Sequence, residues 1–258
     1  MDIPRNNQVF RPLDKEGRLA IANRFKLTNY LIEVPDIIGE GYDLPTNHRS
    51  STTELVLRNS LGDGNCWYRS FSYTILGTED AHLEFRAIMY ASLLKLKQNF
   101  YNAGPAWQVE YDSRIPQAGQ PYVWATNEDM LALATALDVT IVNCYYDTKG
   151  DIKHFPFYPM KDLRGPFNPE EHYKYTPAIY IANTGMRSIV PKEHTNHFRS
   201  ILGVRRKNME PNTRLVTAPG PSTHNYIPGF NPDWLKMQSS KKVSPKKNTK
   251  ELEASFTT

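Results

Sequence analysis

The stretch from Leu61 to Phe71 combines a glycine-bearing turn with a cysteine, a side chain that can attack carbonyl carbon as a thiolate. Gly62 and Gly64 allow positive φ and a close approach of the main chain to a ligand. An apolar run at helical spacing follows: Trp67, Phe71 and Ile75. We therefore expect Cys66 at a helix N-terminus, where the helix dipole stabilises a thiolate. The alternative is a buried cysteine that only packs.

A nucleophilic thiol needs a base that takes its proton. Among the seven histidines, His197 begins a predicted strand and precedes Phe198, so its ring would be rigidly aimed. We expect His197 to be the general base, with His194, which lies before that strand, as the alternative. The other histidines occupy polar contexts or lack a partner signal: His48, His82, His154, His172 and His224.

The second cysteine, Cys144, lies inside an apolar, β-branched run over residues 139–146 and is expected to be an inert core thiol. Two cysteines do not make a secreted disulfide scaffold or a four-cysteine zinc site. We expect a reducing compartment, cytoplasmic or nuclear.

The 258 residues are 40% hydrophobic and 22% charged, which is typical of a globular chain. No run approaches the roughly 18 apolar residues of a membrane span, and residues 1–7 lack the apolar core of a signal peptide. From Arg205 onward there are ten Lys or Arg against four Asp or Glu. We expect a disordered, solvated basic tail over residues 205–258, with nucleic-acid binding or nuclear targeting as the alternative.

Hydrophobic periodicity predicts a mixed order of helices and strands. Helices are expected at residues 15–25, 66–76, 78–100 and 126–137, and strands at 30–34, 139–146, 152–158, 177–183 and 195–204. Thr78 and Thr126 are expected N-caps, the latter with Asp129 as a capping-box acid, and Gly77 is an expected helix stop. This order indicates an α+β or three-layer α/β fold, with a small central sheet flanked by helices.

Residues 101–123 are expected to be irregular, because glycine, proline and aromatic residues dominate there. Four aromatic side chains in or beside this region line a groove or cover a core edge, and the sequence leaves both readings open: Trp107, Tyr111, Tyr122 and Trp124. We divide the chain into an N-terminal extension at 1–53, a body at 54–204 and the tail.

Residues 62–70, Gly-Asp-Gly-Asn-Cys-Trp-Tyr-Arg-Ser, resemble the cysteine box of the ovarian-tumour (OTU) domain deubiquitinases, a branch of the papain-like cysteine proteases. Residues 196–201, Asn-His-Phe-Arg-Ser-Ile, are similar to that family's histidine box. Residues 124–146 resemble its intervening segment, with a Trp, an acidic helix start, an apolar helix and a β-branched strand. The resemblance covers roughly residues 54–204.

The resemblance implies the OTU fold and hydrolysis of the isopeptide bond between the ubiquitin C-terminus and a lysine. By position, Cys66 is then the nucleophile, His197 its base, and Asp63 a member of the site. The amides of residues 63–66 would form the oxyanion hole. The implied partners are ubiquitin or polyubiquitin and a ubiquitinated protein substrate, and the resemblance implies no metal or cofactor.

One position departs from the family pattern. Many members carry Asp or Asn two residues after the histidine to orient the imidazole, and this chain has Arg199, which has only donors. Thr195, Asn183 and Asn196 are alternative orienting residues, and the residues alone do not select one. A catalytically weak OTU-like module that only binds ubiquitin or another protein is therefore the alternative function.

Overall fold

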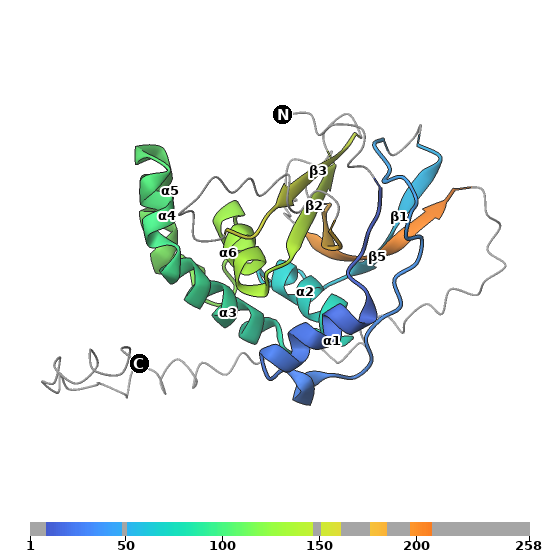
Figure 1. Cartoon of the computed structure of the whole chain (residues 1–258), viewed down its shortest axis with the longest axis horizontal. Helices are drawn as coiled ribbons and strands as arrows, with labels where there is room; N and C mark the ends of the chain where they lie inside the picture. Colours follow the sequence, from blue (N-terminus) through green and yellow to red (C-terminus); the bar gives the residue numbers. More distant parts are fainter. Residues whose placement is uncertain (1–8, 48–50, 147–150, 161–175, 185–196, 208–258) are drawn as a thin grey trace, which may run out of the picture. The chain divides into compact units, whose positions relative to one another are not determined.

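A computed structural model describes residues 9–47, 51–146, 151–160, 176–184 and 197–207. The basic tail that the sequence predicts to be disordered lies outside these residues from position 208 onward, and so do Thr195 and Asn196. The described residues form a mixed α+β fold (Figure 1). Its helices are α1 (Lys15–Arg24), the 3-10 turn η2 (Thr28–Tyr30), α2 (Cys66–Leu76), α3 (His82–Lys95), α4 (Lys97–Asn102), α5 (Pro105–Ala118) and α6 (Asn127–Leu137).

Five strands make one sheet in the order β1-β5-β4-β2-β3. They are β1 (Thr53–Asn59), β2 (Thr140–Tyr146), β3 (Ile152–Phe157), β4 (Ala178–Asn183) and β5 (Phe198–Arg206). Only β2 and β4 pair in parallel, and the other neighbours are antiparallel. Because β5 lies between β1 and β4, the end of the described chain is brought beside the strand that leads into the cysteine turn.

Helix α2 is buried along nearly its whole length, which explains its apolar composition. Trp67, Phe71 and Ile75 are each no more than 1% exposed, as the spacing predicted. They join a core that also contains side chains of α3, α6 and one face of β4 and β5. The helix ends where Gly77 adopts φ +74°, which confirms the predicted stop.

A second core lies on the other face of the sheet and includes the N-terminal segment. Phe10 and Leu44 are buried there beside Tyr180 and Val204. Arg18 of α1 is also buried and donates to the carbonyls of Pro35 and Thr74. The described part of the predicted extension therefore packs on the body.

Three local predictions are wrong. Residues 30–34 do not form a strand: Tyr30 ends η2, the Leu31 amide donates back to the Thr28 carbonyl, and the Ile32 amide donates to the Leu76 carbonyl at the end of α2. Thr78 is not a helix cap: its hydroxyl accepts from the amide of Asp80, and α3 begins only at His82. Residues 101–123 are not irregular, because Pro105 takes the first position of α5, where proline needs no amide partner.

The remaining predicted elements are confirmed within a few residues, and the amide of Thr126 donates to Asp129 Oδ2 as half of the predicted capping box. Among the described residues, no helix is both long and apolar enough to cross a bilayer.

Gly77 provides a stability test with a matched control. A Cβ at Gly77 would lie 1.9 Å from the carbonyl oxygen of Glu33, whereas one at Gly41, at a similar positive φ, would meet nothing within 4 Å. We expect Gly41→Ala to lower the free energy of unfolding by about 1 kcal/mol, the cost of a left-handed alanine. Gly77→Ala should cost about 3 kcal/mol or more. Urea unfolding of both variants measures the difference, and equal losses would contradict the close approach.

Candidate active site

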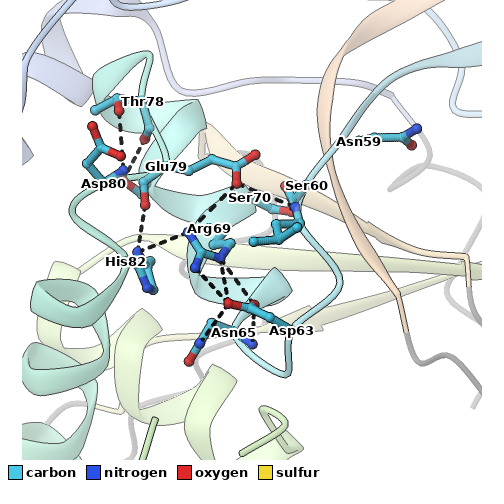
Figure 2. A network of polar contacts seen from close by, with 12 residues as sticks. Asn59, Ser60, Asp63, Asn65, Arg69, Ser70, Thr78, Glu79, Asp80 and His82 are labelled. Atoms are coloured by element: carbon cyan, nitrogen blue, oxygen red, sulfur yellow. Dashed lines mark hydrogen bonds and ion pairs between the residues drawn. The ribbon is translucent and has the colours of Figure 1, made fainter. Parts of the chain in front are cut away.

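The turn before α2 is closed by an ion pair. Asp63 accepts from Arg69 at both carboxylate oxygens, with Nη2–Oδ2 at 2.6 Å and Nε–Oδ1 at 3.1 Å. It also accepts from the amide and the side chain of Asn65, at 3.0 and 3.2 Å (Figure 2). Burial raises the pKa of Asp63, but the bonds from Arg69 and Asn65 outweigh it and hold that pKa below its ordinary value. Asp63 is therefore an ionised carboxylate that fixes the turn.

A second carboxylate ties the turn to its surroundings. Glu79 pairs with Arg58 of β1 at 2.7 Å and lies 4.0 Å from Arg69. Its other oxygen accepts from the amide of Leu61 at 3.4 Å. Both acids beside the turn are thus engaged with arginines (Figure 2).

Arg86 of α3 donates hydrogen bonds to the turn before α2. It is 2% exposed, and its Nη2 donates to Asn65 Oδ1 at 2.8 Å, to the Val123 carbonyl at 2.7 Å and to the Gly64 carbonyl at 3.4 Å. Asn65 Oδ1 also accepts from the amide of Tyr122 at 3.0 Å. Gly64 has φ +79°, and a Cβ there would lie 2.1 Å from the Tyr122 carbonyl oxygen. The turn and residues 122–123 are therefore interlocked, and only glycine fits.

The structure places Cys66 at the first position of α2 and against β5. Its thiol lies within hydrogen-bond reach of the backbone N–H of Phe198, the residue after His197, and of the N–H of Trp67. The residue is only 2% exposed. Burial raises the pKa of the Cys66 thiol above its ordinary value; nearby amides lower it by less, and Asp63 adds to the rise. The thiolate stabilisation expected at a helix N-terminus is thus overturned by desolvation.

His197 immediately precedes β5 and faces the cysteine turn. A Cβ at Gly62 would lie 3.5 Å from its Nδ1 and 3.7 Å from its Cε1, so the ring packs over that glycine. Its carbonyl accepts from the amide of Thr184 at 2.8 Å and from the Thr184 hydroxyl at 3.2 Å. Burial, followed by the Arg199 cation, lowers the pKa of His197, and Glu79 opposes this.

These positions bring Cys66 and His197 to one place, where β5 meets the turn. Asp63 belongs to the same turn, and its carboxylate is bonded to Arg69. Two of the expected oxyanion donors already have acceptors: the Asp63 amide donates to the Leu61 carbonyl, and the Asn65 amide donates to Asp63 Oδ1. The oxyanion role expected of the amides of residues 63–66 stays a prediction.

Two residues that bear on the orientation of His197 lie among the described residues. Arg199 occupies the position after Phe198 and adds a cation beside the ring. Asn183 is buried on β4, directly opposite Phe198. Thr195, Asn196 and His194 lie outside the described residues.

Cys144 is fully buried on β2, as expected of a core residue. Its sulfur lies 3.3 Å from Nδ1 of His154 on β3, and His154 Nε2 donates to the Pro45 carbonyl at 3.0 Å. Burial raises the pKa of Cys144 and lowers that of His154 to about 4. The pair is neutral, and the sequence did not predict the contact.

One of the four aromatic residues covers a core edge, and the groove reading stays a prediction for the other three. Tyr111 is 3% exposed and packs on Phe100, with ring centroids 5.2 Å apart, so it covers a core edge. Tyr122 and Trp124 are substantially exposed beside the turn, and Trp107 is exposed farther along α5. Within the described ranges, no group of three or more His, Cys, Asp or Glu side chains is arranged to hold a metal ion.

Sequence reasoning missed the arginines that support the turn. Arg86 shares a helical stripe with Met89 and Leu93, which are fully buried, so a charge on an apolar face was the available signal. Arg114 is similar: it lies between Tyr111 and Ala118 on α5 and binds Asp129, which also accepts from Tyr68 at 3.2 Å. A buried arginine on such a stripe requires several acceptors.

Residues 59–129, which include the turn, Cys66 and Arg86, match the family described as "Vertnin, OTU domain". This stretch is similar to an OTU domain. The same residues carry the Asp63–Arg69 pair and the interlock with Tyr122. No curated protein sequence matches the chain.

Solved OTU structures are also similar to the chain. The OTU domain protease of Dera Ghazi Khan virus is 12% identical, with 59% of this chain and 82% of that chain covered and a TM-score of 0.42. The OTUD1 OTU domain is 19% identical, with 73% and 99% covered and a TM-score of 0.41. The Hazara virus OTU bound to ubiquitin is 15% identical, with 61% and 83% covered and a TM-score of 0.38.

Removing the Arg86 side chain should destabilise the turn before α2. Arg86→Met leaves the carbonyls of Gly64, Ala118 and Val123 and the Asn65 side chain without their shared donor. We expect the free energy of unfolding to fall by about 3 kcal/mol or more, because each buried acceptor left unpaired costs about 1–3 kcal/mol. Urea unfolding measures this, with Arg206→Met on the exposed end of β5 as the control. Equal, small losses in both variants would contradict the assigned role.

The buried thiol also predicts a pH dependence. Only the thiolate is alkylated, and the pKa of Cys66 is raised from 9.0, so the folded protein holds less thiolate at any pH than an exposed cysteine does. The rate of Cys66 alkylation by iodoacetamide should still rise as pH passes 9.0. Intact mass of a Cys144→Ser variant, which leaves one thiol, follows the reaction. A rate already constant below neutral pH would reveal a thiolate–imidazolium pair instead.

Proposed function

We propose that this chain is a thiol-dependent deubiquitinase that hydrolyses the isopeptide bond at the ubiquitin C-terminus. Cys66 is the nucleophile and His197 the general base and acid. The observation that carries the proposal is the contact of the Cys66 thiol with the amide of Phe198, directly after His197. That contact lies beside a segment that matches an OTU domain.

The proposed reaction follows from the two side chains. His197 takes the thiol proton, and Cys66 sulfur attacks the isopeptide carbonyl carbon to give a tetrahedral oxyanion. Backbone amides of the turn stabilise that oxyanion. The imidazolium then protonates the leaving lysine nitrogen as the C–N bond breaks, which leaves a thioester. Water, deprotonated by His197, hydrolyses the thioester and releases the ubiquitin carboxylate and the free thiol.

The charges of the site bear on how this reaction begins. Burial raises the pKa of Cys66 and lowers that of His197, and both shifts favour a neutral thiol beside a neutral imidazole. The proton therefore moves only as the substrate carbonyl is attacked, rather than in a preformed ion pair. Asp63 contributes by fixing the turn through Arg69.

The test uses the full chain and a ubiquitin probe with a C-terminal electrophile. We expect wild-type protein to form one covalent adduct at Cys66 and Cys66→Ala to form none, with Cys144→Ser as the matched control that still labels. A panel of diubiquitins then measures turnover and linkage preference. Folded wild-type protein that neither labels nor cleaves would rule out the enzyme.

A second function, a ubiquitin-binding module without useful turnover, is favoured by two observations. Cys66 is only 2% exposed, and Arg199 opposes the imidazolium that catalysis requires. This function predicts ubiquitin binding by calorimetry with undetectable cleavage. Turnover restored by Arg199→Asn would show that the cation at this position is what limits the site.

A further inference from the structure

Arg199 differs from the other partly or fully buried arginines of the described residues in having no partner. Arg58 and Arg69 pair with carboxylates, and Arg86 donates to carbonyls. Arg199 makes no hydrogen bond or ion pair with any described residue, and its Nε is buried without an acceptor. Buried donors in folded proteins nearly always have an acceptor, so an unpaired one indicates a missing ligand or a functional role.

The neighbours of Arg199 lie near the start of β5, which runs between β1 and β4. Asn59 on β1 is its direct cross-strand partner, which puts the two side chains on the same face of the sheet, with Cβ atoms roughly 5 Å apart. His197 lies two residues earlier on the same chain, and so shares that face by strand alternation. Asn59 is exposed, and Arg199 and His197 are partly exposed. Asn59 points away from the Asp63–Arg69 network (Figure 2).

Neither carboxylate near the turn is free to pair with Arg199. Asp63 is held by Arg69, and Glu79 is held by Arg58 and the Leu61 amide. On β4 the residue opposite Arg199 is Ala182, which has no polar side chain. The guanidinium, which has only donors, therefore shares its face of the sheet with the His197 ring and has no described carboxylate as a partner.

We propose that Arg199, with Asn59, binds a single carboxylate supplied from outside the chain, and that this carboxylate accepts from the His197 ring and orients it. This inference rests on the proposed function of Cys66 and His197. Arginine recognises a carboxylate through two parallel N–H bonds, which leaves the second lone pair of an oxygen for the imidazole. The carboxylate would act where many OTU proteins carry their own Asp or Asn. An acidic side chain of the substrate protein and a free small carboxylate share this chemistry.

The first experiment measures binding without turnover. Formate is added to the full chain at constant ionic strength, with chloride as the balancing anion, and the His197 ring is titrated by NMR. Formate should raise the pKa of His197, because it neutralises the Arg199 cation and accepts from the imidazolium; Glu79, the other charged group acting on the ring, is unchanged. The shift should vanish in Arg199→Asn and persist in Arg206→Asn, which removes a cation from the exposed end of the same strand. Equal shifts in all three proteins would overturn the site.

The second experiment measures activity with two carboxylate sources. Formate should raise the kcat/KM of wild type roughly tenfold over chloride, because one added hydrogen bond contributes about that much. The kcat/KM of Arg199→Asn should be the same in formate and in chloride. Without formate, ubiquitin joined to a lysine peptide with a neighbouring Glu should be cleaved faster than the matched Gln peptide. A formate response without a Glu preference assigns the site to free carboxylates.

Separate outcomes distinguish this inference from the proposed function. Cleavage by wild type that depends neither on formate nor on the peptide acid would overturn the carboxylate site and leave the deubiquitinase standing. Absence of probe labelling at Cys66 in wild type and Arg199→Asn, with and without formate, would overturn the enzyme. A formate-dependent shift of His197 in that same protein would still support the carboxylate site.

Discussion

The packing of α2 against β5 is the contact on which the candidate site depends. Two buried polar contacts fix it: Ser200 Oγ donates to the Ser70 carbonyl at 2.9 Å, and the Cys66 thiol lies at the Phe198 amide. A third contact, between the Ser60 and Ser70 hydroxyls at 2.8 Å, ties the same helix to the residue after β1. A shift of the helix along the strand would leave these groups unpaired inside the core, at about 1–3 kcal/mol each. The spacing of Cys66 and His197, which are far apart in the chain, is therefore set by the core rather than by a flexible loop.

The sequence predicted the elements whose signals are local and failed where tertiary contacts decide. Helix α2 and its stop at Gly77 followed from apolar spacing and a glycine, and the β2 run was recognisable from its β-branched residues. The sequence does not indicate helix α5, because the glycine, proline and aromatic residues of this region are typical of loops. Its buried stripe becomes visible only when Tyr111 packs on Phe100 and Arg114 binds Asp129.

The residues of the candidate site were recognisable from the sequence, but the effect of burial on their pKa values was not. The motif around Cys66 predicted a thiol at a helix start, and the structure puts it there. It did not predict that desolvation would outweigh the helix dipole, because burial depends on α2 being enclosed on all sides. Arg86 was missed for the same reason: its acceptors come from residues 64–65 and 118–123, which are distant in sequence.

The arginines around the turn differ in whether a carboxylate neutralises their charge. Arg69 and Arg58 are matched by Asp63 and Glu79, and these pairs fix the backbone while cancelling their charge. Arg199 has no such match, so the positive charge beside His197 is uncompensated. A cation there stabilises a negative oxyanion or thiolate but destabilises a positive imidazolium. Hydrolysis requires both the negative charge on the substrate oxygen and the positive charge on His197 to develop. An acceptor brought by the bound molecule would resolve this conflict, since it would cancel the cation only when a substrate is in place.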